Sequence, residues 1–245
     1  MFRIKQMARG YKEMSGHELR SAREKHGWNQ TDTARRLGVS QGYLALMEGG
    51  RRNVPAKLAS KAVRVLDLSP TSLPVRSQPP LSTVDADGLA RQLASLGYPG
   101  FAYMRAGWKR NPAEVLVSAL AQDSLESRLT EALPWVLLGY AEQLDRRWLV
   151  EQARLHRLSN RLGYVVHLAK RSLEARRHQE SPRYRALDSL ENELRASRFD
   201  VEDTLCQSSL SQAERDWLRE TRPEEARYWH LLTDWRPEHL QYANP

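Results

Sequence analysis

The apolar residues near the N-terminus recur every three or four positions, which is the spacing of the buried face of an amphipathic helix. Ser15 is a good N-cap for a first helix in which Leu19 and Ala22 point inward. Gly27 is suited to end that helix. The same spacing continues to about residue 68, so this region is expected to hold four or five helices and to form one small domain.

Two of these helices are expected to be joined by a tight turn. Asn29 is a good cap for the first of them, Ala34 and Leu37 form its apolar step, and Gly38 can take the left-handed conformation that ends it. Ser40 can then cap the second helix. The pattern therefore predicts a helix-turn-helix.

The second helix of this pair has one apolar and one polar face. Leu44 and Met47 are expected to face inward, whereas Gln41, Tyr43 and Ala45 point away. A helix held against a scaffold in this way is offered to the major groove of DNA. The sequence therefore predicts a DNA-reading helix.

A change of composition follows the first domain. A fourth helix is expected to begin at Pro55 and to end near Asp67. Residues 69–83 then carry four prolines and six Ser or Thr without any period, which predicts a partly extended linker. Residues 1–14 are basic and lack apolar periodicity, so they are expected to form a flexible arm.

Residues 84–245 form a succession of short amphipathic patterns, and no strand pattern competes with them. Leu187, Leu190 and Leu194 make an apolar stripe, and Ser211 with Glu214 makes a capping box. The second domain is therefore expected to be all α, without a fixed repeat. The predicted helices are 87–96, 113–122, 124–133 stopped by Pro134, 135–144, 145–156, 159–177, 182–197, 211–221 and 223–233.

Length and composition fit two globular domains. The chain has 245 residues and 40% hydrophobic content, which is enough for a core. The single cysteine, Cys206, has no partner for an internal disulfide, and no leader-like or membrane-spanning apolar run is present. A cytoplasmic protein without a membrane span is expected.

The basic excess is confined to the first third of the chain. Residues 1–80 hold 15 Lys and Arg against 6 Asp and Glu, whereas the remaining residues hold 23 against 24. Attraction to phosphates supplies most non-specific DNA affinity. Because the excess coincides with the helix-turn-helix pattern, it favours DNA over a merely solvated basic surface.

A set of residues at specific spacings carries a family resemblance. The set consists of Leu19, Arg20, Arg23, Asn29, Gln30, Ala34, Leu37, Gly38, Val39, Ser40, Gln41, Leu44, Met47, Glu48, Gly50 and Pro55. With this set, residues 15–68 resemble the lambda-repressor-like helix-turn-helix family, also called the xenobiotic-response-element (XRE) family.

The resemblance implies roles for particular residues. Gln30 is expected to bind a phosphate or to brace the third helix, and Gln41 to read a base edge, since Gln pairs bidentately with adenine. Arg23 and Glu48 are expected to join the first helix to the end of the third, as an exposed pair that sets orientation more than stability. The expected DNA-contacting residues are Gln30, Ser40, Gln41, Gly42, Tyr43, Leu46, Arg51, Arg52 and Lys57.

The sequence departs from the family at three positions. Gly42 and Leu46 stand where members often carry polar base readers, so contact with thymine methyl groups and DNA shape are expected to matter more. Thr33 stands where the family usually has leucine, which predicts a thinner core beneath the second helix.

The second domain holds six of the seven tryptophans, and most are expected in its core. Because Trp and Tyr are also favoured at partner interfaces, a C-terminal docking surface is an alternative. Its candidate residues are Tyr228, Trp229 and Trp235.

No catalytic or metal-binding constellation stands out in the second domain. Its histidines (His156, His167, His178, His230 and His239) lack metal-ligand spacing, and Cys206 has no nearby base. The acids between Asp200 and Asp203 suit either a cation site or, more simply, a helix start. We expect no enzyme, no cofactor and no metal.

Residues 158–168 bear a weak likeness to antitoxins of AbiE-type toxin–antitoxin systems, and the simpler interpretation is a helix with Gly163 at a close crossing. The main hypothesis is a transcriptional regulator, either a repressor or an autoregulating antitoxin that holds a toxin protein. It would bind a palindromic operator as a homodimer. The alternatives are a ligand-sensing regulator with a small-molecule pocket in the second domain and a DNA-directed enzyme.

Overall fold

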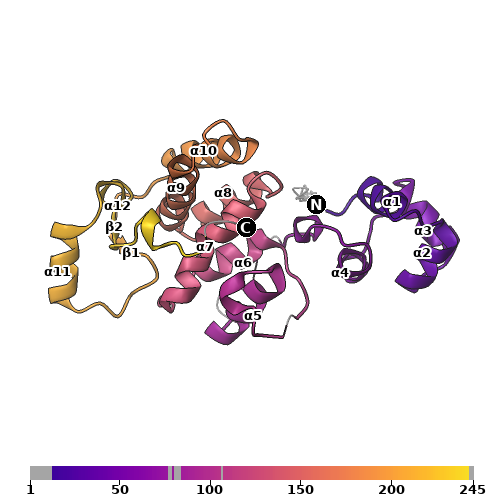
Figure 1. Cartoon of the computed structure of the whole chain (residues 1–245), viewed down its shortest axis with the longest axis horizontal. Coiled ribbons are helices and arrows are strands. Elements are labelled where there is room, and N and C mark those ends of the chain that lie inside the picture. The colour runs from indigo at the N-terminus through magenta and orange to yellow at the C-terminus, as the bar shows by residue number, and fades with distance from the viewer. Residues whose placement is uncertain (1–12, 77–78, 80–83, 106, 243–245) are drawn as a thin grey trace, which may run out of the picture. The chain divides into compact units, whose positions relative to one another are not determined.

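The chain is organised as two compact units, Met1–Ser77 and Gln78–Pro245, each described here by itself. The computed structural model describes residues 13–76, 79, 84–105 and 107–242 (Figure 1). These residues form twelve α-helices, three short 3-10 helices and two strands of two residues each. The predicted all-α class is confirmed.

The first unit is a bundle of four helices that ends in a 3-10 turn. Its first helix begins with a capping box, because Ser15 Oγ accepts from the Glu18 N–H while the Glu18 carboxylate accepts from the Ser15 N–H. Gly27 follows the helix with φ of +69°. The elements are α1 (Gly16–Lys25), α2 (Gln30–Leu37), α3 (Gln41–Glu48), α4 (Ala56–Val65) and η1 (Pro70–Ser72) (Figure 1).

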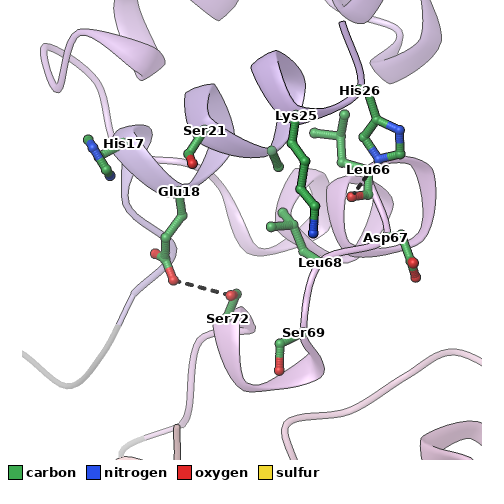
Figure 2. A pocket seen from close by; sticks show the side chains of 11 residues that line it. His17, Glu18, Ser21, Lys25, His26, Leu66, Asp67, Leu68, Ser69 and Ser72 are labelled. Carbon is green, nitrogen blue, oxygen red and sulfur yellow. Dashed lines mark hydrogen bonds between the residues drawn. The ribbon is translucent and has the colours of Figure 1, made fainter.

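The packed first unit extends beyond both of its predicted ends. Met14 was expected in the flexible arm, but its side chain is buried in the core; the rest of that arm, up to residue 12, lies outside the described residues. Leu73, in the predicted linker, also belongs to this core. Figure 2 shows the hydroxyl of Ser72 donating to the Glu18 carboxylate of α1. Local composition missed these contacts because they join residues far apart in the chain.

A glycine sets how closely α1 approaches the end of α3. A Cβ atom on Gly16 would lie 1.8 Å from the backbone carbonyl oxygen of Met47, far inside van der Waals contact. A glycine at the start of a predicted helix is the only sequence signal of this approach. The N-terminus of α1 therefore fixes the C-terminal end of α3.

The second unit has eight α-helices among its described residues. They are α5 (Ala86–Leu96), α6 (Pro112–Leu120), α7 (Ser127–Tyr140), α8 (Arg146–Leu155), α9 (Ser159–Ala175), α10 (Pro182–Arg195), α11 (Gln212–Thr221) and α12 (Glu224–Tyr228). The remaining elements are η2 (Pro99–Phe101), η3 (Pro237–His239), β1 (Asp203–Thr204) and β2 (Leu231–Leu232) (Figure 1).

Pro134 lies inside α7 and does not end it, so the predicted break between 124–133 and 135–144 is wrong. A proline inside a helix costs about 3 kcal/mol, because it removes a backbone hydrogen bond. Here the flanking side chains of Leu133, Val136 and Leu137 are fully buried. Burial of such side chains contributes roughly 1.5–3 kcal/mol each, which is enough to offset the proline.

The predicted helix 223–233 is also wrong in its second half. α12 ends at Tyr228, and His230 has a φ of +53°, which no helix continues through. Leu231 and Leu232 then pair in parallel with Asp203 and Thr204. The two strands are too short to show an alternating pattern, so only their pairing reveals them.

Helix α9 is the central element of the second unit. It packs along α10 and also contacts α7, α8 and α12 (Figure 1). Gly163 faces the buried indole of Trp229, whose ring carbons lie 2.3 Å from where a Cβ atom would be. The hydroxyl of Tyr164 donates to the Trp235 carbonyl oxygen at 2.5 Å. The close crossing expected at Gly163 therefore exists, and its partner is an indole from the C-terminal region.

A buried carboxylate joins α9 to α10. Glu191 is 1% exposed and contacts Lys170 at 2.6 Å, Arg195 at 3.1 Å and His167 at 3.3 Å. Burial alone would raise its pKa, but the hydrogen bonds from His167, Lys170 and Arg195 reverse this and lower the pKa to about 2. Glu191 is therefore ionised at neutral pH.

This cluster predicts acid sensitivity of the α9–α10 pair. A carboxylate whose pKa is depressed by folding contributes stability that is present above its unfolded pKa, near 4.5, and lost as the pH falls towards 2. Hydrogen exchange of α9 and α10 between pH 6 and pH 2 should show this loss. Glu191→Gln should flatten the profile, and an unchanged profile would contradict the prediction.

Within the part of the chain that the structure describes, no helix combines the length and apolar character needed to cross a membrane.

Candidate nucleic-acid interface

The turn between α2 and α3 is built by local capping. The side chain of Asn29 accepts from the Asp32 N–H at 2.8 Å, and Gly38 ends α2 with φ of +73°. Ser40 then accepts from the Tyr43 N–H at 3.2 Å and starts α3. The caps and the left-handed glycine are the ones predicted, because this geometry depends on neighbours in sequence.

A buried ion pair connects α1 with the C-terminal end of α3. Arg23 Nε lies 2.7 Å from Glu48 Oε1, and Arg23 Nη2 lies 3.0 Å from Glu48 Oε2. The side chains are 11% and 2% exposed, so the pair is not the solvent-exposed one that was expected. The hydrogen bonds that Arg23 donates to Glu48 raise the pKa of Arg23. Arg23 Nη1 also donates to the Trp28 carbonyl oxygen, so one guanidinium joins α1, α3 and the loop between α1 and α2.

The ion pair continues into the two glutamines. Gln30 Nε2 donates to Glu48 Oε2 at 2.9 Å, and Gln41 Nε2 donates to Gln30 Oε1 at 2.7 Å. A carboxylate only accepts, so Gln30 must turn its NH₂ group to Glu48 and its oxygen to Gln41. Gln41 then keeps its own oxygen and one N–H outside this chain of bonds. Glu48 thus orients the amide at the start of α3.

The outer face of α3 is small and partly aromatic. Gln41 and Gly42 are exposed, and a Cβ atom on Gly42 would meet nothing within 4 Å. Tyr43 and Leu46 are half-buried, and Tyr43 packs against the core of the first unit. An open glycine beside Gln41 permits close approach of a groove wall.

The cations expected around this face are present and exposed. Arg51 and Arg52 follow α3, where both N–H groups donate to the Leu46 carbonyl oxygen, and the Arg52 guanidinium lies 5.7 Å from the centre of the Tyr43 ring. Lys57 lies in the first turn of α4. Such cations suit phosphate contacts that set the register on DNA.

One cation of this unit was missed in the sequence. The exposed guanidinium of Arg36 lies 4.1 Å from the centre of the Trp28 ring, which itself stacks on His26. Trp28 and Arg36 are eight residues apart across a helix start, so no helical spacing reveals the contact.

Thr33, the departure from leucine, is fully buried, and its hydroxyl donates to the Asn29 carbonyl oxygen.

The three aromatic residues proposed as a docking surface do not form one. Trp229 is 1% exposed and packs on Gly163, so its assignment to a docking surface is corrected to the core. Trp235 is half-buried, and its carbonyl oxygen accepts from Tyr164. Tyr228 alone is exposed, at 42%. The amphipathic spacing of this segment did not show which ring would turn inward.

The acids at 200–203 do not start a helix, because α10 ends at Arg195 and α11 begins at Gln212. Asp203 lies in β1 and accepts two bonds from Arg161, at 2.6 and 2.9 Å. No group of three or more His, Cys, Asp or Glu among the described residues is placed to hold a metal ion. Burial raises the pKa of Cys206 to about 11, so its thiol stays protonated at neutral pH.

Comparison with known proteins identifies the first unit and leaves the second without a match. Residues 19–73 match the helix-turn-helix family model, as the resemblance to the XRE family predicts. No curated protein and no solved structure matches the chain. The match supports a DNA-binding transcriptional regulator, and its end at residue 73 agrees with the burial of Leu73 in the first core.

Proposed function

We propose that the chain is a sequence-specific transcriptional regulator that reads DNA through α3, with Gln41 as its principal base-reading residue. The observation that carries the proposal is the chain of bonds from Arg23 through Glu48 and Gln30 to Gln41. It holds one donor and one acceptor of Gln41 ready for the N7 and N6 edge of adenine. Preorganisation of this kind lowers the cost of ordering a side chain on binding.

In more detail, the proposed regulator is a repressor that binds a palindromic operator as a homodimer. Two copies of α3 would enter the major groove one helical turn apart, roughly 34 Å. The contact with Trp229 explains Gly163 in the antitoxin-like segment without any partner protein. A role in holding a toxin protein stays a hypothesis.

The first test is binding to DNA from the upstream region of its own gene. We expect Gln41→Ala to lose about 1–3 kcal/mol of discrimination between this DNA and random-sequence duplex. Lys57→Ala is the matched control, because loss of a phosphate contact weakens binding to both duplexes alike. Titration at two salt concentrations measures both. Equal discrimination by wild type and Gln41→Ala would refute α3 readout.

A second candidate is a regulator whose operator affinity changes with a small ligand. Figure 2 shows the groove that favours it, between α1 and the end of α4, with a volume of about 480 Å³. It combines apolar side chains such as Leu66 with the Lys25 ammonium group. The hollow beside Tyr164 in the second unit is about 170 Å³, below the size of ordinary ligand sites.

A further inference from the structure

The second unit carries a contiguous row of arginine and aromatic side chains on its surface. We call it the Arg–aromatic strip, and it consists of Arg157, Phe199, Arg198, Tyr228 and Arg195. The Arg157 guanidinium lies 5.5 Å from the centre of the Phe199 ring. Those of Arg198 and Arg195 lie 4.3 and 5.6 Å from the centre of the Tyr228 ring. Three arginines therefore lie over two rings, and the two cation–ring groups are joined through the neighbouring residues Arg198 and Phe199.

The strip is held rigidly from below. Asn160 donates to the Phe199 carbonyl oxygen and accepts from the Phe199 N–H, at 2.8 and 2.9 Å. Arg198 Nη1 donates to the Tyr228 carbonyl oxygen at 2.7 Å. Tyr228 in turn packs edge-on against the buried Trp229. Its arginines thus lose less conformational freedom on binding than ordinary surface arginines.

The charge of the strip is mostly uncompensated. Arg157 and Arg198 are exposed, and neither has a carboxylate partner within the described part of the chain. Arg195 contacts Glu191, and Lys170 bridges Glu191 and Asp188, so the charges of this cluster balance and the excess comes from Arg157 and Arg198. The exposed acid beside the strip, Asp200, lies 3.2 Å from His230. Residues 84–245 are near neutral overall, so this local excess is not a general property of the unit.

The arginines of the strip lie near the C-terminal ends of helices, which stabilises their charge. This position alone does not account for their exposure to solvent. Arg195 lies in the last turn of α10, and Arg198 binds the carbonyl at the end of α12, where the helix dipole favours cations. Each guanidinium has five N–H donors, so most of these donors stay available for an anion.

We propose that the Arg–aromatic strip is a second DNA contact, which binds backbone phosphates of duplex DNA while the first unit occupies the major groove. The partner is duplex rather than single-stranded because guanidinium groups already cover the ring faces on which bases would stack. Covalent linkage to a DNA-bound unit raises the effective concentration of the strip near phosphates. The inference rests on the proposed function of the first unit.

The test compares two triple variants of the full chain. The strip variant combines Arg157→Gln, Arg195→Gln and Arg198→Gln, which remove the three positive charges of the strip. Arg177→Gln, Arg183→Gln and Arg185→Gln make the same charge change at the other end of the α9–α10 pair. On random-sequence duplex, the logarithm of the binding constant decreases linearly with the logarithm of the salt concentration. We expect the magnitude of this negative slope to be smaller by about 2–3 for the strip variant, since each phosphate contact contributes about 0.9. The control should keep the wild-type slope.

Lysines at the three strip positions keep the charge and should restore most of the slope, which separates lost phosphate contacts from a disturbed fold. Equal slopes for the strip and control variants would overturn the proposal. This is the result expected if the strip binds an acidic protein instead of DNA. Because random-sequence DNA is used, the outcome is independent of the Gln41 test. Equal discrimination in the Gln41 test together with a strip effect here would refute base readout by α3 alone, whereas lost discrimination together with equal slopes would refute the strip alone.

Discussion

Replacing Glu48 by alanine is expected to destabilise the first unit by about 3–5 kcal/mol. The change leaves the Arg23 guanidinium buried without its carboxylate, and an uncompensated buried charge costs that much. It also removes the acceptor that orients Gln30, so Gln41 is free to turn. The variant should lose stability and base discrimination together.

The matched control for this change is Glu24→Ala. Glu24 also contacts Arg23, at 3.4 Å, but its side chain is 52% exposed. An exposed pair contributes only about 0.2–1 kcal/mol, so this variant should stay near wild type. Hydrogen exchange of α1–α4 amides gives the local free energy of unfolding without interference from the second unit. Equal losses for the two variants would show that burial of the ion pair has no energetic weight.

Gly163→Ala is expected to destabilise the second unit by about 1–3 kcal/mol or more. In an exposed helix the same change is stabilising by about 1 kcal/mol, because alanine is the better helix former. Here the new methyl group would lie 2.3 Å from two ring carbons of Trp229, and a buried indole has little room to move. The steric term should therefore decide the sign.

The measurement is hydrogen exchange of α9, with near-ultraviolet circular dichroism as a report on indole packing. Gly42→Ala is the control, because a Cβ atom there meets nothing within 4 Å, and it should stabilise α3 slightly. Trp229→Leu should restore part of the stability lost in Gly163→Ala, since the smaller side chain relieves the contact. A more stable α9 in Gly163→Ala alone would mean that Trp229 does not pack on it.

Fold class and the candidate site were predictable from sequence to different depths. The turn between α2 and α3 was predicted correctly, because Asn29, Gly38 and Ser40 act on backbone groups a few residues away. Gln30 donates to Glu48 and accepts from Gln41, which lie 18 and 11 positions away, and only the family resemblance pointed to these bonds. The Arg–aromatic strip was not predicted, since its members come from three separate stretches, at residues 157, 195–199 and 228.

The sequence by itself determined the capped starts and the apolar faces of α1, α2 and α3, because capping and periodicity are local properties of the backbone. Tertiary structure alone decided that α7 continues through Pro134, that Trp229 turns inward and that the Arg23–Glu48 pair is buried. These outcomes depend on burial energies from residues distant in sequence, which exceed the local preferences that a pattern can reveal.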